Sequence, residues 1–394
     1  MNLDISGRAR TAMALVLVSM SLQSGSVNAQ STTVSVLKWD LTELKGSLKI
    51  VDSERISITN PDGSSMMVSP DDVAVLDFGS DRDPNPGSKG SGTGMIWLTD
   101  GTRHTGWPDI QGTSMVWRNW WSGTIDPDVE DIVAFDESSA TDPPVPRSMD
   151  VVVMGNGDVV MGIVDSIGES VVVEVSEGDV VEFPLDRVRS LSLVNPVDRG
   201  PGTRAWLSPG DEVILNDYRY DHGTGFRVEG KEPLMLRQVR AIAFDASRVL
   251  PLAGIECTVS PLDEYPRFRV PRPDFSRAPS PLNAPPLTLR GPLRVEWDLP
   301  RTGMGLHARA SLPESVRGLG SAEIVIHDGD LRVWSANLDV DTPAVTISTT
   351  IASGRLGIEI RESSSGPIGN AIRLDRALLL ATPPVDPGNG SDQE

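Results

Sequence analysis

Four segments of about fifty residues end in the same way, and this repeat constrains the fold more than any other feature. Each closes on a valine, a leucine or isoleucine three residues later, and another apolar residue two positions further on. The closing valines are Val73, Val129, Val188 and Val239. A fixed period of this kind indicates a chain built from copies of one supersecondary unit.

The beginnings of the segments also agree. Three of them carry a glycine 27, 23 and 26 residues before the closing valine, at Gly46, Gly106 and Gly162. In two segments a turn dipeptide, Asp100-Gly101 or Asn156-Gly157, ends five residues before that glycine. Asp-Gly and Asn-Gly favour two-residue hairpin turns because their backbones tolerate positive φ. Each segment therefore predicts four or five short antiparallel strands.

The residue pattern favours an all-β chain: tandem small SH3-like barrels followed by a jelly-roll β-sandwich. Alternating apolar residues recur and long 3.6-residue periods are absent. The 37 glycines and 31 prolines supply many turns. Closing a small sheet into a barrel also protects its edges. The likeness of the repeats to SH3-like or Sm-like barrels of secreted bacterial proteins rests on their spacing.

Composition changes predict where the segments begin and end. Gly79 to Gly94, Glu137 to Arg147 and Asn195 to Gly202 are rich in Gly, Pro, Ser or Asp, as linkers are. The resulting assignment is a signal peptide (1–29), four barrel repeats (30–80, 94–137, 148–195 and 203–246), a sandwich (248–381) and a disordered tail (382–394).

The first 29 residues have the pattern of a secretory signal. Arg8 and Arg10 precede the apolar run from Ala12 to Leu22, and Val27-Asn28-Ala29 offers a small-residue cleavage site. No later stretch approaches the 18 apolar residues of a membrane-spanning helix. We therefore expect a secreted, periplasmic or cell-envelope protein without membrane insertion.

The net charge of −20 narrows the range of partners. Such an acidic chain is repelled by nucleic acids and by anionic lipids. Neutral glycans, other envelope proteins, basic protein partners and cations remain open as partners. The single cysteine, Cys257, excludes an intrachain disulfide framework. No residue spacing predicts a metal site or a cofactor.

The last third of the chain contains the run from Gly303 to Leu312. Gly303 and Gly305 predict a tight bend leading into a strand. His307 lies between Leu306 and Ala308, so it points to the opposite face of that strand. We interpret Gly303, Gly305 and His307 as a structural motif, with His307 as a hydrogen-bonded core residue in preference to a ligand.

This run resembles the Gly-Leu-Gly-Val-His-Ala signature of the NPCBM family of carbohydrate-binding modules. The resemblance covers roughly 248 to 381 and includes the Asp328-Gly329 hairpin and the final apolar strand near Asp375. It implies a β-sandwich and a sugar-binding role. The family's Phe-x-Ala-x-Val-Gly-x-Asp segment is absent from Pro313 to Ser321.

A sugar site needs an aromatic ring to stack on and polar groups at its rim. The predicted sandwich offers Trp297 and Trp334 as carbohydrate-binding candidates, with Arg294 and Arg332 as polar contacts. Both tryptophans follow alternating strand patterns, so packing in the core is their alternative role.

Five of the nine tryptophans lie in the second repeat. Trp120 and Trp121 are adjacent, so in a strand one of them faces outward, and we take the pair as a candidate interaction surface. The alternative is that a contact between barrels buries both.

These observations predict a non-catalytic protein that recognises extracellular or envelope glycans. The four histidines are scattered among the segments, which disfavours a catalytic triad, and no carboxylate pair is singled out. An envelope protein-interaction scaffold without glycan binding is the alternative function. A divergent glycoside hydrolase is the least favoured.

Overall fold

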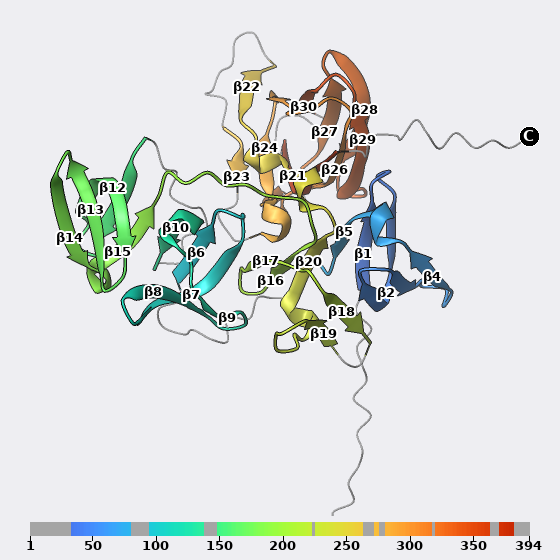
Figure 1. The fold of residues 1–394 in the computed structure, drawn as a ribbon. Helices are drawn as coiled ribbons and strands as arrows, with labels where there is room; N and C mark the ends of the chain where they lie inside the picture. Colours follow the sequence, from blue (N-terminus) through green and yellow to red (C-terminus); the bar gives the residue numbers. More distant parts are fainter. Residues whose placement is uncertain are drawn as a thin grey trace, which may run out of the picture. The chain divides into compact units, whose positions relative to one another are not determined.

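The computed structural model describes residues 33–79, 94–137, 148–222, 225–262, 272–275, 280–316, 320–362 and 370–381. Regular structure in these ranges consists of antiparallel strands and three-residue 3-10 helices, which confirms the all-β prediction (Figure 1). The predicted signal peptide, the tail and most of the linkers before and after the second repeat lie outside the described residues.

The first two repeats each contain five strands, and we name them unit 1 (33–79) and unit 2 (94–137). Unit 1 has β1 (Thr33–Lys38), β2 (Glu43–Asp52), β3 (Ile56–Thr59), β4 (Ser65–Val68), η1 (Pro70–Asp72) and β5 (Val73–Asp77). Unit 2 has β6 (Gly94–Leu98), β7 (Arg103–Gln111), β8 (Ser114–Asn119), β9 (Gly123–Ile125), η2 (Val129–Asp131) and β10 (Ile132–Asp136).

The next two repeats follow the same order, and we name them unit 3 (148–195) and unit 4 (203–246). Unit 3 has β11 (Asp150–Met154), β12 (Val159–Ile167), β13 (Ser170–Ser176), β14 (Asp179–Pro184), η3 (Leu185–Arg187) and β15 (Val188–Ser192). Unit 4 has β16 (Arg204–Leu207), β17 (Glu212–Ile214), β18 (Tyr218–Asp221), β19 (Gly225–Val228), η4 (Leu236–Gln238) and β20 (Val239–Ala243).

A common strand plan underlies the units. In units 1 to 3 the first strand pairs with the second and the fifth, and the second strand continues into a hairpin with the third. A 3-10 turn precedes the fifth strand in all four units. The predicted hairpin turns are present, with positive φ at Gly101 and Gly157. The likeness to SH3-like barrels stays a prediction.

The structure corrects the alignment of the second repeat. Val73, Val188 and Val239 each begin a fifth strand and are buried, but Val129 lies in the 3-10 turn before β10. Its structural counterpart is Ile132, which is fully buried. The error arose because Val129 and Ile132 show the same three-residue spacing as Ile132 and Phe135.

The repeated glycines have one structural cause. A Cβ built on Gly46, Gly106 or Gly162 would lie 2.6, 2.0 or 2.3 Å from a carbonyl oxygen of the third strand. The glycine therefore lets the second strand bend closely under the third. In unit 4 Leu215 stands in this place, just beyond the end of the short β17.

Replacing Gly162 with alanine is expected to lower the free energy of unfolding by about 1–3 kcal/mol, because the added methyl overlaps the carbonyl of Glu174. Gly155→Ala is the matched control, since its Cβ would meet nothing closer than 3.6 Å. Urea denaturation measures both. Equal effects of the two substitutions would contradict the close approach.

Fifth strands join the units in pairs. β5 of unit 1 lies antiparallel to β20 of unit 4, with Leu76 opposite Ile242. β10 of unit 2 lies antiparallel to β15 of unit 3, with Phe135 opposite Leu191. Unit 1 is thus paired with unit 4, and unit 2 is paired with unit 3. Each pairing covers one edge strand of each of the two units.

The C-terminal part of the chain (248–381), which we call the sandwich, has two sheets. Its strands are β21 (Val249–Pro251), β22 (Cys257–Pro261), β23 (Asp274–Phe275), β24 (Leu287–Arg290), β25 (Leu293–Asp298), β26 (Met304–Ser311), β27 (Ala322–Asp328), β28 (Leu331–Leu338), β29 (Ala344–Ile351), β30 (Arg355–Glu362) and β31 (Ala371–Ala381). A short 3-10 turn, η5 (Ala246–Arg248), leads from unit 4 into the sandwich, which contains η6 (Leu252–Gly254), η7 (Pro281–Asn283) and η8 (Glu314–Val316).

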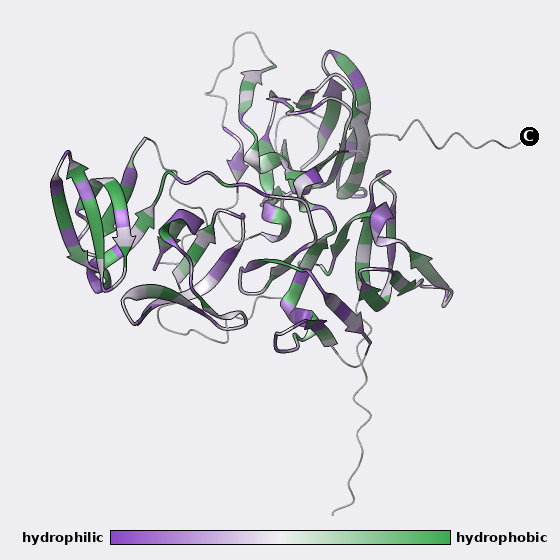
Figure 2. Cartoon of the chain, viewed as in Figure 1, coloured by the Kyte–Doolittle hydropathy of each residue, from purple (hydrophilic) through white to green (hydrophobic). Residues whose placement is uncertain are grey.

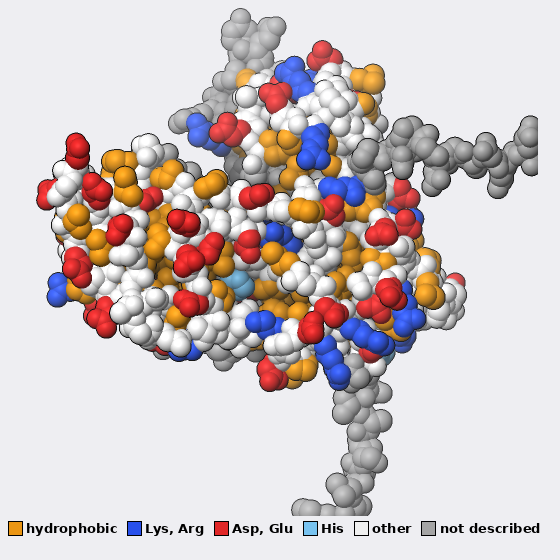
Figure 3. Space-filling model, viewed as in Figure 1, with side chains coloured by type: hydrophobic (Ala, Val, Ile, Leu, Met, Phe, Trp, Pro, Cys, Tyr) orange, Lys and Arg blue, Asp and Glu red, His pale blue; other side chains and the backbone are white. Residues whose placement is uncertain are grey.

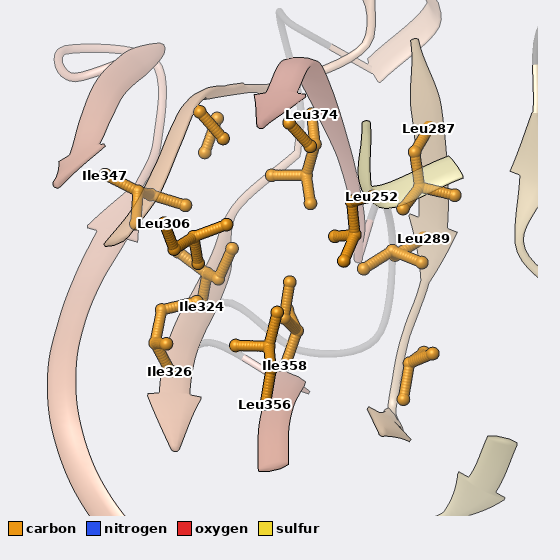
Figure 4. Packing of buried hydrophobic residues seen from close by; sticks show 14 of the residues in the cluster. Leu252, Leu287, Leu289, Leu306, Ile324, Ile326, Ile347, Leu356, Ile358 and Leu374 are labelled. Carbon is orange, nitrogen blue, oxygen red and sulfur yellow. The ribbon is translucent and has the colours of Figure 1, made fainter. Parts of the chain in front are cut away.

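One sheet of the sandwich has six strands and the other has five. The six-stranded sheet runs β23-β24-β31-β26-β29, with β21 also paired to β31, and the five-stranded sheet runs β22-β25-β30-β27-β28. Leu306 of the first sheet and Ile324, Ile326 and Ile358 of the second meet in one core (Figure 4). In β25, β26 and β30 alternate residues point into this core, as two packed sheets require.

Part of the outer face of the six-stranded sheet is also buried. Leu378 and Leu380 of β31 belong to one apolar cluster with Val75 of β5 and with Ala241 and Ala243 of β20. The outer face of the sandwich therefore covers the sheet that units 1 and 4 build together. Arg376, next to these leucines, forms an ion pair with Asp77.

Candidate functional site

Two of the predicted sugar-binding residues lie on the outer face of the five-stranded sheet. Arg294 on β25 is cross-strand to Glu359 on β30, and Arg332 on β28 is cross-strand to His327 on β27. The apolar neighbours of Arg294, Leu293 and Val295, point into the core. The alternation thus places these charged side chains on one surface.

Glutamates pair with the arginines of this surface. Arg294 Nη2 lies 2.9 Å from Glu296 Oε1 and donates to the carbonyl of Gly329 at 3.0 Å. Arg332 Nη2 donates to Glu323 Oε1 at 2.8 Å. These ion pairs neutralise the arginines and occupy part of their hydrogen-bonding capacity.

A second set of contacts surrounds Glu359 on the same surface. His327 Nε2 lies 2.7 Å from Glu359 Oε2, and Arg361 Nε donates to Glu359 Oε1 at 2.7 Å. Although burial opposes it, hydrogen bonds from Arg361 and His327 lower the pKa of Glu359. The carboxylate is therefore held in its charged form, which suits a structural pair better than a general acid.

The tryptophans of the sandwich do not complete a sugar platform on this surface. Trp297 is fully buried, so its interpretation as a stacking ring is wrong: it fills the core from β25. Trp334 is half-buried and packs against the same core, because it is cross-strand to the inward-facing Ile326. Trp297 is therefore a core residue, and the buried part of Trp334 also packs against the core.

An exposed aromatic ring lies instead in unit 2. Trp107 on β7 has half of its surface exposed. The two-residue turn Gly112-Thr113 sets the register of β7 and β8, so that Trp107 is opposite Arg118 and Pro108 is opposite Trp117. Trp117 is fully buried, so Trp107 and Arg118 share the outer face.

Polar side chains surround Trp107. Arg118 Nε donates to Asp109 Oδ2 at 3.0 Å, and its Nη1 donates to Thr124 Oγ1 on β9 at 2.5 Å. The hydrogen bond from Arg118 lowers the pKa of Asp109. We call Trp107, Asp109, Arg118 and Thr124 the tryptophan face. It combines an apolar ring with fixed donors and acceptors, which is the chemistry that a sugar ring requires.

The other aromatic candidates lie at the contact between units 2 and 4. Trp120 and Trp121 fall in the turn between β8 and β9 and not in a strand. Trp121 is buried among apolar residues of units 1 and 4 and donates to Glu232 O at 2.9 Å, so it is not part of an external surface. Trp120 is 43% exposed, but its Nε1 is tied to Asp211 Oδ2 at 2.7 Å.

Asp211 organises this contact. It lies 1% exposed in the turn of unit 4 between β16 and β17. Its Oδ1 accepts hydrogen bonds from Thr105 N, from Thr105 Oγ1 at 3.0 Å and from Asn119 Nδ2 at 3.1 Å. Burial raises the pKa of Asp211 to about 6, although the hydrogen bonds from Thr105 and Trp120 act to lower it. The carboxylate of Asp211 thus joins unit 4 to unit 2 through hydrogen bonds.

The Gly303–Leu312 run faces unit 1. Positive φ at Gly303 makes the predicted bend into β26. A Cβ on Gly305 would lie 2.7 Å from Leu41 Cδ2, so this glycine makes room for a side chain of unit 1. His307 points to the same outer face. Its interpretation as a core residue is therefore wrong.

His307 is half-buried, and its Nδ1 lies 3.1 Å from Ser348 Oγ on the neighbouring strand β29. Burial lowers the pKa of His307, while Glu43 of unit 1 opposes the shift. The predicted motif therefore works as a docking surface for unit 1.

Gly305→Ala is expected to destabilise the protein by about 1 kcal/mol, because the methyl overlaps Leu41. In a Leu41→Ala background the same substitution should cost much less, since the space is then empty. A double-mutant cycle by thermal unfolding measures this coupling. Additive effects of the two substitutions would contradict the contact.

Two hollows in the surface have the size of a small-molecule site. The larger, ≈ 460 Å³, is lined by residues such as Trp39 and Arg248. Arg248 covers the Trp39 ring at 3.9 Å from its centroid and donates to Ala381 O, so both side chains are already engaged. The other, ≈ 340 Å³, lies on unit 4 and includes Arg219 and Lys231. Neither presents a free aromatic ring.

In the described part of the chain, no group of three or more His, Cys, Asp or Glu side chains is arranged to hold a metal ion. Burial raises the pKa of the Cys257 thiol, which disfavours its reactive thiolate form. Among the described residues no helix is long and apolar enough to cross a bilayer.

No family profile and no curated protein sequence matches the chain. Among solved structures it is similar to the CBM51 module of a Clostridium perfringens GH95 protein in complex with methyl-galactose. The identity is 10%, the coverage is 33% of this chain and 99% of that one, and the TM-score is 0.26.

Tandem CBM51 modules of a Streptococcus pneumoniae family 98 glycoside hydrolase match at 10% identity, with 84% and 93% coverage and a TM-score of 0.27. The CBM51-2 and INT domains of C. perfringens ZmpB, in complex with GlcNAc, match at 7% identity, with 66% and 43% coverage and a TM-score of 0.28. TM-scores of this size do not establish a common fold. The site is therefore assigned from its side chains alone.

Proposed function

We propose that this chain is a non-catalytic glycan-binding protein that acts outside the cell or in the cell envelope. The observation that carries the proposal is the tryptophan face. Its half-exposed Trp107 lies beside Arg118, which Asp109 and Thr124 hold in place. Sugar recognition needs this combination of a stacking ring and fixed polar groups.

The charge of the surroundings favours a neutral glycan. Asp109 neutralises Arg118, so the tryptophan face carries no net positive charge to attract uronic or sialic acids. The chain as a whole has a net charge of −20, which repels polyanionic polysaccharides. A neutral hexose needs no positive charge on the tryptophan face and is not repelled by the negative charge of the chain.

A glycan array tests the proposal with the chain from Gln30 to Glu394. We expect binding to neutral glycans, and we expect Trp107→Ala to lose it. Binding of anionic glycans alone, or no binding at all, would contradict the proposal. A role as a protein-interaction scaffold would then be the better function.

The non-catalytic part of the proposal needs a separate assay. Incubation with chromogenic glycosides is expected to release no chromophore above the rate without protein. Turnover that a carboxylate substitution abolishes would make the chain a glycoside hydrolase instead.

A further inference from the structure

Unit 3 carries an exposed apolar stripe. Val159, Met161 and Ile163 alternate along β12 and are 58%, 45% and 63% exposed. Val180 on β14 extends the stripe and is 59% exposed. It lies on the same face because Glu174 of β13 is cross-strand to both Ile163 and Val180. Contiguous exposed apolar residues, unlike scattered ones, mark interaction surfaces.

The stripe extends outward from the junction of units 2 and 3, on the same face of the sheet as the residues that the sandwich covers at the junction of units 1 and 4. Where β5 of unit 1 meets β20 of unit 4, the outer face lies beneath Leu378 and Leu380 of the sandwich. Where β10 of unit 2 meets β15 of unit 3, the residues on this face continue across the sheet. β15 pairs with β11, whose Val151 and Val153 are cross-strand to Met161 and Val159 of β12. Val159 and Met161, at that end of the sheet, are exposed. Figure 2 colours much of the strands of unit 3 green, for hydrophobic residues.

Acidic residues border the stripe. Glu174 is cross-strand to Ile163 and Val180, and the exposed Glu182 lies two residues after Val180 on β14, so both share the face of the stripe. The exposed Asp158 lies immediately before β12, and the exposed Asp179 begins β14. Residues 148–195 contain nine acidic residues and two arginines, which gives unit 3 a net charge of −7. Figure 3 shows red acidic side chains among orange hydrophobic ones over these strands, at the left of the view.

The negative charge around the stripe determines which kind of protein surface could bind there. A two-fold contact between two copies of the chain would bring the acidic rims together, which costs free energy. A partner with a basic rim gains instead. Within the chain, the sandwich already shows this chemistry: Arg376, beside Leu378, pairs with Asp77 at the covered face.

We propose that the stripe of unit 3, defined as Val159, Met161, Ile163 and Val180, docks a second protein whose contact surface is apolar and ringed by lysine and arginine. This interaction is separate from the tryptophan face of unit 2. One chain then binds a glycan through unit 2 and a basic protein through unit 3.

Site-specific photo-cross-linking tests the proposal with the full secreted chain. A p-benzoylphenylalanine replaces Met161, and in the control it replaces Leu331, which is 67% exposed on β28 of the sandwich. Each is added to the envelope fraction of the producing cells. We expect a polypeptide of different sequence to be cross-linked at position 161 only, through a peptide that contains both apolar and basic residues.

Two further measurements make the test decisive. The yield should fall at least tenfold when NaCl is raised from about 50 mM to about 500 mM, because the rim contact is screened. It should fall similarly in Ile163→Glu and Val180→Glu, with unfolding temperatures unchanged because both residues are exposed.

Other outcomes overturn the proposal. Cross-linking to a second copy would make the stripe a dimer contact. Equal yields at positions 161 and 331, a yield that salt leaves unchanged, or no cross-linked product would each show that no basic partner docks there.

Discussion

Replacing Asp211 with alanine is expected to lower the free energy of unfolding by about 3–5 kcal/mol. The substitution removes the acceptor for Thr105, Asn119 and Trp120, whose donors are directed at one carboxylate. Thr105 and Asn119 are buried, so their donors lose a partner where water does not readily replace it.

Chemical denaturation measures this effect, with Asp217→Ala as the control. Asp217 is an exposed aspartate in the same unit, and its loss is expected to change stability by less than about 0.5 kcal/mol. Similar stabilities for the two variants would show that Asp211 does not fasten unit 4 to unit 2.

The pH dependence of stability gives an independent test. Burial raises the pKa of Asp211 to about 6, whereas an unfolded chain has an aspartate pKa of about 3.9. The folded state therefore binds the proton more tightly, and stability falls as the pH rises from about 4 to about 6. The loss is about 3 kcal/mol over this window. In Asp211→Ala this part of the slope should be absent, and an unchanged slope would contradict the assignment.

Replacing Trp107 with alanine is expected to weaken glycan binding about 30-fold, which corresponds to about 2 kcal/mol for an exposed stacking ring. The folded structure should persist because half of the side chain already lies in solvent. Isothermal titration with the strongest glycan from the array measures the loss. Trp107→Phe should recover part of the affinity, since a smaller ring still stacks.

Trp334→Phe is the matched control for the tryptophan face. It alters a half-buried ring of the sandwich, the place where the sequence predicted a sugar platform. We expect unchanged glycan affinity in this variant. A loss at position 334 with none at position 107 would return the site to the sandwich.

Local patterns predicted much of the fold. The glycines at positions 46, 106 and 162 marked the bent second strand because each needs the same close approach of a carbonyl. The Asn156-Gly157 turn formed for a local reason as well, since Gly157 adopts positive φ. Such features depend on neighbours within one unit, and a sequence displays those neighbours.

The pairing of units could not be predicted in this way. The fifth strands are alike, with Leu76, Phe135, Leu191 and Ile242 at one equivalent position, so nothing local selects β20 as the partner of β5. Gly305 presents the same difficulty. Its lack of a side chain makes room for Leu41, which lies more than 260 residues earlier in the chain.

The candidate site was missed for a related reason. Trp120 and Trp121 stood out because they are adjacent, yet they fall in a turn that contacts unit 4. The sequence did contain a signal for Trp107. The two-residue turn Gly112-Thr113 fixes the register of β7 and β8, so that Trp107 lies opposite Arg118 and on the other face of the hairpin from the buried Trp117. The tryptophan face therefore follows from a hairpin register and not from aromatic density.

Fluorine NMR of the chain labelled with 5-fluorotryptophan tests the central claim most directly. The resonance of Trp107 is assigned by its disappearance in Trp107→Phe, and a neutral oligosaccharide from the array is then titrated. We predict a saturable shift of the Trp107 resonance while those of the buried Trp117 and Trp297 stay in place. A shift of the Trp334 resonance with none at Trp107 would contradict glycan binding at the tryptophan face.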